Sequence, residues 1–202
     1  MSTVNFGTRE INCKIVYYGP GLCGKTTNLL FVHKKVPAKY RTDMVSLATD
    51  GDRTLFFDFL PLVTNAVKGF STKFQLYTVP GQVFYNATRK LVLQGVDGLV
   101  FVADSSWSRM NDNHESFVNL KENLADYGLT LEEIPYVLQF NKRDLPDVAQ
   151  VEYMNRLLNK EKQRVPIFES IAVKGVGVFE TLNAISRMVL VKLISELTAK
   201  KE

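Results

Sequence analysis

The sequence predicts one domain of the α/β class, with a doubly wound and mostly parallel sheet in which a hairpin supplies one antiparallel strand. Strand-like and helix-like segments alternate along most of the chain. An apolar run at residues 15–18 enters a glycine-rich loop that continues into helix-prone residues, which is typical of a buried parallel strand. Two strand-like segments, residues 54–62 and 70–78, are close enough to pair as an antiparallel hairpin. At 202 residues the chain suits one buried core, so we expect residues 1–202 to form a single domain.

The first half of the chain should hold a strand, a helix, a loop and the hairpin. Residues 11–18 form the strand, and the helix after the glycine-rich loop should end near Val36, because Pro37 cannot continue it. Residues 38–53 are polar and poorly periodic, which predicts a long loop of the kind that often serves function. Alternate residues of the second hairpin strand predict one buried face, made of Phe70, Thr72, Phe74, Leu76 and Thr78.

The second half should continue the alternation of helices and strands. We expect a short helix at 84–93, a buried strand at 98–103, a helix at 112–127, a strand at 134–140, a helix at 150–158, a short strand at 165–168 and a last helix that starts near Gly177. Apolar residues recur at helical spacing in this last helix, so one of its faces should pack against the sheet.

Composition excludes several classes of protein. The net charge of +4 is small and no basic run exceeds a pair, so we expect no nucleic-acid partner. The start lacks a signal-peptide pattern and a glycine at position 2, the end lacks a prenylation cysteine, and no apolar run is long enough to span a bilayer. We expect Cys13 and Cys23 to be reduced, as in a cytoplasmic protein with no membrane anchor of its own.

Residues 19–26, Gly-Pro-Gly-Leu-Cys-Gly-Lys-Thr, fit the phosphate-binding P-loop pattern G-x-x-x-x-G-K-S/T. The glycines allow main-chain N–H groups to point inward, and the start of the next helix adds its positive end. Lys25 should reach the β- and γ-phosphates of a nucleotide, and the Thr26 hydroxyl should bind Mg²⁺. A glycine turn that binds nothing is the alternative, which the strand, loop and helix order disfavours. The predicted nucleotide-binding residues of this loop are Gly19, Gly21, Leu22, Cys23, Gly24, Lys25, Thr26 and Thr27.

Residues 141–144, Asn-Lys-Arg-Asp, follow a predicted strand and indicate the base. Guanine presents two adjacent N–H donors that the Asp144 carboxylate can accept together, whereas adenine presents no such pair. Asn141 can bridge the base and neighbouring loops, and the stem of Lys142 can cover the ring. By itself the motif could be a polar turn. Because parallel strands end at one edge of a sheet, however, the P-loop, residues 78–82 and this motif should meet there.

With these motifs the chain resembles the Ras-like small GTPases over essentially its whole length, and more closely their bacterial MglA branch, known for cell polarity and gliding motility. The closer match rests on Asp52-Arg-Thr-Leu-Phe-Phe-Asp-Phe-Leu-Pro61 and Thr78-Val-Pro-Gly-Gln-Val-Phe-Tyr85. The resemblance implies a GTP-hydrolysing switch that binds GTP or GDP with Mg²⁺. Its switch I would span about 38–58 and its switch II about 78–93.

The resemblance also assigns roles to single residues. Thr54 looks like the switch I threonine that senses Mg²⁺ and the γ-phosphate, and Gly81 like the switch II glycine whose N–H meets that phosphate. Gln82 looks like the residue that orients the attacking water, and Arg53 resembles an arginine finger supplied by the chain itself. A surface arginine is the alternative for Arg53. Ala172 resembles the loop residue that offers its main-chain N–H to the guanine oxygen.

One position departs from the Ras-like pattern. Thr78 stands where an aspartate usually holds the magnesium shell through water. Asp52 or Asp58 could substitute, and we favour Asp58, although a strand aspartate with no metal role is an alternative. The departure motivates a second hypothesis, a nucleotide-loaded scaffold without useful turnover. A third, an ATPase or nucleotide kinase, conflicts with Asp144.

The resemblance finally implies partners. These are a roadblock-fold activator dimer of the MglB type, polar regulators of the response-regulator type, and motility or cytoskeletal effectors. The hairpin and the switch segments are the expected contact surface, and recruitment to a cell pole or to motility complexes would follow from such contacts.

Overall fold

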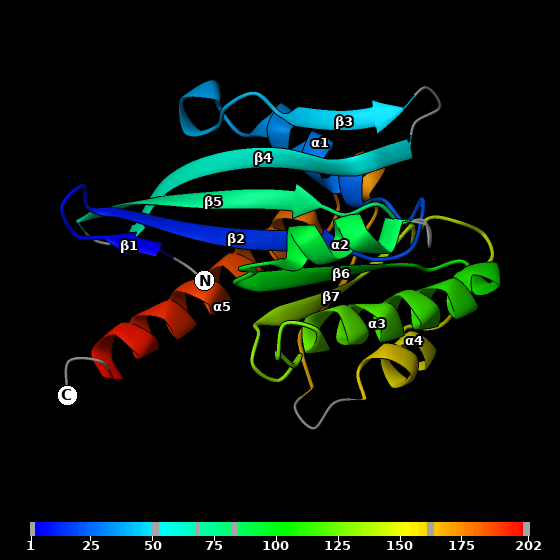
Figure 1. Ribbon diagram of the computed structural model, residues 1–202. Coiled ribbons are helices and arrows are strands. Elements are labelled where there is room, and N and C mark those ends of the chain that lie inside the picture. Colours follow the sequence, from blue (N-terminus) through cyan, green and yellow to red (C-terminus); the bar gives the residue numbers. More distant parts are fainter. Residues whose placement is uncertain (1–2, 50–52, 68, 82–84, 161–163, 200–202) are drawn as a thin grey trace.

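The computed structural model describes residues 3–49, 53–67, 69–81, 85–160 and 164–199. In these ranges the chain forms a sheet of eight strands with helices on both faces (Figure 1). The strands are β1 (Thr3–Asn5), β2 (Glu10–Tyr18), β3 (Val45–Thr49), β4 (Arg53–Val67), β5 (Phe70–Thr78), β6 (Gly98–Asp104), β7 (Tyr136–Asn141) and β8 (Ile167–Glu169). The α-helices are α1 (Lys25–Lys35), α2 (Asn86–Leu93), α3 (Met110–Ala125), α4 (Val151–Leu158) and α5 (Val178–Ala199). Short 3-10 helices occur at η1 (Ala38–Tyr40), η3 (Trp107–Arg109) and η4 (Ala172–Lys174).

The sheet is mostly parallel, as the sequence predicts. Its strand order is β3-β4-β5-β2-β6-β7-β8, with β1 paired to β2 off this path. Strands β5, β2, β6, β7 and β8 run in parallel, while β4 pairs with β5 in antiparallel register, with Phe59 opposite Tyr77. Strand β1 is also antiparallel to β2 and is an addition to the expected pattern.

The expectation of a loop over residues 38–53 is wrong in part. Val45–Thr49 forms the edge strand β3, and Arg53 belongs to β4 rather than to a loop. Thr49 pairs with Arg53 and Ala48 with Thr54, so the main chains of β3 and β4 are paired here. An edge strand gains its stability from pairing on one side, and its sequence therefore need not alternate as a buried strand does.

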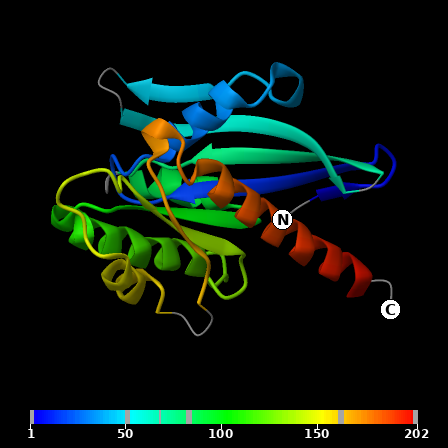
Figure 2. The same ribbon diagram turned by 180° about the vertical axis from the view of Figure 1, so that it is seen from behind.

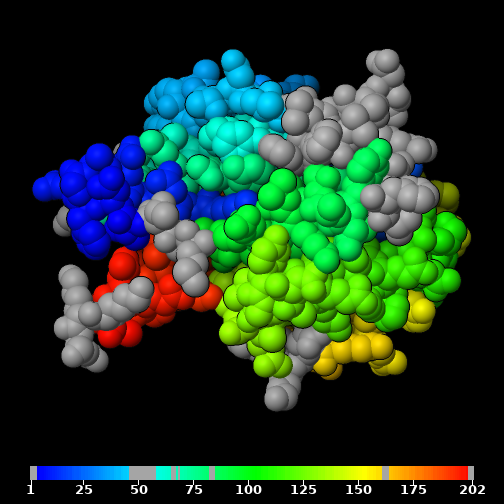
Figure 3. Space-filling model, in the orientation of Figure 1, coloured from blue at the N-terminus to red at the C-terminus, as the bar shows by residue number. Residues whose placement is uncertain are grey.

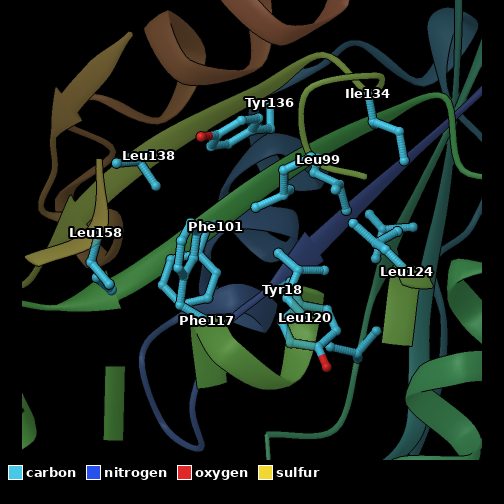
Figure 4. Packing of buried hydrophobic residues seen from close by; sticks show 14 of the residues in the cluster. Tyr18, Leu99, Phe101, Phe117, Leu120, Leu124, Ile134, Tyr136, Leu138 and Leu158 are labelled. Atoms are coloured by element: carbon cyan, nitrogen blue, oxygen red, sulfur yellow. The ribbon is translucent and has the colours of Figure 1, made fainter. Parts of the chain in front are cut away.

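Helices α2, α3 and α4 cover one face of the sheet and α1 and α5 the other (Figures 1 and 2). Strand β6 is buried along its whole length, because its alternate side chains enter two cores. On the α3 face Phe101 lies edge-to-face against Phe117, with ring centroids 4.9 Å apart (Figure 4). On the other face Val100 and Val102 belong to the cluster with α5. The alternation expected in residues 70–78 is confirmed for Thr72, Phe74, Leu76 and Thr78, which are buried, whereas Phe70, expected on the same face, is only partly buried at the start of the strand.

Three further features complete the description of the fold. Within the described ranges, we find no helix whose length and apolar character would let it span a membrane. Cys13 and Cys23 are free and buried. In the space-filling view, α2 and α3 lie side by side and form one continuous surface (Figure 3).

Candidate functional site

Three loops meet at the carboxyl edge of the sheet, as their positions after β2, β5 and β7 predict. The Asn141 side chain, after β7, donates its Nδ2 hydrogen to the carbonyl of Cys23 in the P-loop at 2.8 Å. Gly81, after β5, lies so close to the P-loop that a Cβ there would be 2.3 Å from the nitrogen of Gly21. Only glycine fits at position 81 in this arrangement, and the three polar segments therefore form one site.

The P-loop turns into α1 at Gly24, whose φ of 103° lies in the left-handed region. A Cβ at Gly24 would also come within 2.2 Å of Asn141 Nδ2, so this position needs glycine for both reasons. The first turn of α1 then directs main-chain N–H groups toward the loop. This is the helix start that favours an anion.

Lys25 is buried inside the loop. Its Nζ donates to the carbonyls of Gly19 at 2.9 Å and of Pro20 at 2.7 Å. Burial lowers the pKa of Lys25 and raises the pKa of the Cys23 thiol beside it. Cys23 is thus a neutral packing group here. The carbonyls of Gly19 and Pro20 hold the Lys25 ammonium group at the centre of the loop, where phosphate oxygens need a positive charge.

Asp58 occupies the position next to Thr26. Its Oδ2 accepts hydrogen bonds from the Thr26 hydroxyl at 2.5 Å and from the Thr78 hydroxyl at 2.8 Å. The Asp58 main-chain N–H in turn donates to Thr78 Oγ1 at 2.9 Å. Asp58 is completely buried. A carboxylate from β4 therefore stands beside the P-loop threonine, although β5 has a threonine where Ras-like proteins have an aspartate.

The Asn141 side chain connects the base-binding loops to the P-loop. Its Oδ1 accepts from the Ser170 hydroxyl at 3.0 Å and from the Ala172 N–H at 2.9 Å, while its Nδ2 binds Cys23. The Ala172 N–H, which the resemblance directs toward a guanine oxygen, thus donates to Asn141 in this structure. The loops after β2, β7 and β8 are fixed to one another through this single carboxamide.

Lys142 and Asp144 follow on the same loop. Lys142 has a φ of 66° and its Nζ bonds the buried Asp104 Oδ2 at 2.6 Å, which fixes the lysine stem. Asp144 forms an ion pair with Lys174 at 3.1 Å and is partly exposed. Both side chains therefore stand beside Asn141 with defined partners.

A cavity of about 610 Å³ lies at the phosphate end of the site. The P-loop, the segment after β5, and helices α2 and α3 line it, and the Asn141–Asp144 loop does not. The residues around it are Pro20, Gly21, Leu22, Gly24, Lys25, Thr26, Thr27, Val79, Gly81, Asn86, Arg89, Arg109, Asp112, Glu115, Ser116 and Asn119.

Several expected site residues come from the switch segments. The main chain of Arg53 and Thr54 lies in β4, beyond the Asp58 and Thr78 pair and past the end of β5. Gln82 and Asp52 lie outside the described residues.

Sequence reasoning missed three contributors to the site, Asp104, Ser170 and Arg109. Asp104 is a polar residue at the carboxyl end of an apolar strand. The same signal marked Asn141, so Asp104 could have been found from the sequence. Ser170 directly follows β8 and carries the same signal. Arg109 precedes α3, with no motif around it, and its Nη2 reaches the Gly21 carbonyl at 2.8 Å.

A buried lysine enclosed by a glycine-rich loop at the start of a helix, with a cavity in front of it, is the way in which P-loop proteins bind the phosphates of a nucleotide. The fold adds a hairpin beside the P-loop strand and an Asn-Lys-x-Asp loop two strands away. Together they define the class of small GTP-binding proteins.

Comparison with known proteins identifies the family. Residues 56–189 match the ADP-ribosylation factor family, and the chain belongs to this family of small GTPases. It is 57% identical over 193 residues to the mutual gliding-motility protein MglA of Myxococcus xanthus, covering 96% of this chain and 98% of that protein. The GTPase Obg proteins of Anoxybacillus flavithermus and Listeria monocytogenes are 34% and 33% identical over 88 residues, which is 44% of this chain and 20% of each Obg protein. The resemblance inferred from the motifs is confirmed, and the protein binds guanine nucleotides and hydrolyses GTP to GDP and phosphate.

Replacing Asn141 with alanine should lower the free energy of unfolding of the nucleotide-free protein by about 2 to 3 kcal/mol, because it leaves the buried Cys23 carbonyl and Ala172 N–H without their partner. Urea denaturation followed by circular dichroism measures this change. Asn183→Ala, at an exposed position of α5, is the matched control and should have little effect. An equal loss in both variants would contradict the special role of Asn141.

Proposed function

We propose that this protein is a GTP-controlled switch of cell polarity and gliding motility, slow to hydrolyse GTP alone and accelerated by a partner. The observation that carries the proposal is the match to the mutual gliding-motility protein MglA along 98% of that protein, at 57% identity. A match of this extent includes both switch segments as well as the nucleotide-binding loops. The second hypothesis, a scaffold without turnover, rests on the threonine at position 78 in place of an aspartate. Asp58 offers a carboxylate beside Thr26, so the threonine is no longer a reason to prefer that hypothesis.

In this proposal the chain supplies its own catalytic groups. Arg53 would neutralise charge that develops on the transferring phosphate, and Gln82 would orient the attacking water. Thr54 and the N–H of Gly81 would contact the γ-phosphate in the GTP state. The antiparallel pairing of Arg53 and Thr54 with β3 supports a slow rate without a partner, because a partner that changes this pairing would reposition both residues.

The contact between Gly81 and Gly21 supports a switch at this place. The two main chains touch beside the phosphate cavity, and a Cβ at Gly81 would also be 2.5 Å from the carbonyl carbon of Pro20. A group that binds between them must move Gly81 away from the loop. The γ-phosphate is such a group, so its presence would be transmitted directly to switch II.

The donor set beside the P-loop fits Mg²⁺. Thr26 lines the cavity and offers a hydroxyl, and the buried carboxylate of Asp58 accepts from that hydroxyl, so two hard oxygen donors lie side by side next to the P-loop. We propose that Thr26 and Thr54 hold the ion directly and Asp58 through water. When bound, Mg²⁺ neutralises phosphate charge. Asp58 and Thr78 hold the Thr26 hydroxyl in place.

We further propose a roadblock-fold activator dimer of the MglB type, polar regulators, and motility or cytoskeletal effectors as partners. The support is that β3 forms an edge of the sheet, with Val45 about half exposed, next to the switch I strand. A partner that binds there could change the pairing of Arg53. A cytoplasmic location with recruitment to a cell pole or to motility complexes would follow.

Single-turnover hydrolysis with and without a purified MglB-type homodimer tests this function. We expect the dimer to raise the rate at least about tenfold. Slow GTPases lack a fixed arginine finger and a fixed water-orienting glutamine, and the dimer would hold both in place. Arg53→Ala and Gln82→Ala should each abolish the acceleration and still bind GDP. Full acceleration in both variants would refute the proposed catalytic groups.

Asp144→Ala should remove the preference for guanine, since its carboxylate is the proposed acceptor for the two guanine donors. Competition of GDP and ADP for a fluorescent GDP analogue measures the preference. Lys174→Ala is the control, because it removes the ion-pair partner of Asp144 but keeps the acceptor. If Asp144→Ala kept the original ratio of GDP to ADP affinity, Asp144 would have no role in base selection.

Asp58→Asn should weaken the effect of Mg²⁺ on nucleotide retention by about tenfold, as expected when a residue that supports metal ligands is changed. The release rate of fluorescent GDP at increasing Mg²⁺ concentration measures the effect. Asparagine keeps the size of the side chain, and a thermal unfolding curve checks the fold. An unchanged Mg²⁺ dependence would show that Asp58 is a strand aspartate with no metal role.

A further inference from the structure

The start of α3 reaches the P-loop through one side chain. Arg109 ends the 3-10 helix η3, and its Nη2 donates to the Gly21 carbonyl at 2.8 Å. Its Nη1 pairs with the carboxylate of Asp112, one turn later on α3. Arg109 and Asp112 line the cavity on its α3 side, while Lys25 and Thr26 line it on the P-loop side, where the phosphates are expected. The guanidinium group is thus fixed at one end by α3 and holds the loop at the other.

The three carbonyls at the start of the P-loop do not point the same way. Those of Gly19 and Pro20 accept hydrogen bonds from Lys25 Nζ, inside the loop. That of Gly21 accepts from Arg109, on the α3 side. In a trans peptide unit the C=O and N–H groups point in opposite directions. The Leu22 N–H, which shares its peptide plane with the Gly21 carbonyl, is therefore directed away from Arg109 and across to the other side of the loop main chain.

Leu22 needs external support in this conformation. Its φ is 64°, in the left-handed region that costs energy for a residue with a side chain. Its side chain is 65% exposed, so packing contributes little to holding it there. The hydrogen bond from Arg109 acts on the carbonyl directly before it. That bond is charge-assisted and therefore stronger than a neutral one.

We propose that Arg109 is a positioning residue for GTP hydrolysis, which holds the Gly21–Leu22 peptide unit so that the Leu22 N–H stays aimed at the phosphate chain. Charge builds up on the phosphate oxygens in the transition state, and a donor that is already oriented stabilises it without rearrangement. Arg109 acts through the loop and not on the phosphate, because two of its nitrogens are engaged by Gly21 and Asp112. It therefore differs in role from Arg53.

The proposal separates hydrolysis from binding. GDP is held by many groups of the loop and of the base site, so a slightly rotated Leu22 peptide should change its affinity little. The rate of the chemical step depends on how closely the donors around the transferring phosphate are aligned, so rotating one of them should change the rate more. A merely structural brace would instead lower the melting temperature and the GDP affinity together.

The experiment compares Arg109→Ala and Arg109→Lys with the unaltered chain, and uses Arg156→Ala, exposed on α4, as the matched control. Single-turnover hydrolysis of bound GTP, the dissociation constant of GDP and the melting temperature are measured for each. Arg109→Ala should hydrolyse GTP about tenfold more slowly, with GDP affinity within about twofold and a melting temperature that falls by at most about 4 °C, as expected for the loss of one hydrogen bond. Lysine can still donate to the Gly21 carbonyl and should recover part of the rate, and the control should match the unaltered chain.

The β-phosphate resonance in the phosphorus spectrum of bound GDP should also shift in Arg109→Ala and return toward its original position in Arg109→Lys. An unchanged hydrolysis rate in Arg109→Ala would overturn the proposal. So would a rate that falls only in proportion to GDP affinity. If Arg109→Ala does not fold, Arg109→Lys decides, because a loss of affinity and melting temperature without loss of rate would leave Arg109 a structural brace.

Discussion

The site depends on the buried carboxamide of Asn141. Its three hydrogen bonds reach the P-loop at Cys23 and the loop after β8 at Ser170 and Ala172. Hydrogen bonds from both ends of a buried amide stiffen the segments that it connects, and breaking them costs stability. The phosphate side and the base side of the site are consequently one rigid unit, built on the ends of β2, β7 and β8.

Two buried carboxylates complete this unit in different ways. Asp104 receives the ammonium group of Lys142 and two hydrogen bonds from Ser106, so its charge is compensated within the protein. Asp58 receives hydroxyl groups from Thr26 and Thr78. A buried carboxylate is costly unless it is paired or hydrogen-bonded. Asp104 therefore fixes the base-binding loop through Lys142, and Asp58 fixes the hydroxyl of the P-loop threonine.

The start of β4 lies at a less supported place than the nucleotide-binding loops. Arg53 and Thr54 pair with Thr49 and Ala48 of β3 past the last residue of β5, whereas Val45 pairs with Phe59, which also pairs with Tyr77 of β5. Edge elements open at lower free energy than central strands. At the end of β5, Gly81 touches Gly21 with no side chain between the two main chains. The nucleotide-binding loops, by contrast, are joined by the buried Asn141 side chain.

The sequence by itself determined the core strands, the helices and the nucleotide-binding loops, because hydrophobic period and glycine placement are local properties of the chain. It did not determine β3, since an edge strand gains stability from backbone pairing and needs no alternation of side chains. Only the tertiary structure decided that Asp58 meets Thr26 across 32 residues and that Arg109 meets Gly21 across 88. Such contacts depend on the register of β4 against β5 and on the packing of α3, which arise only when distant segments come together.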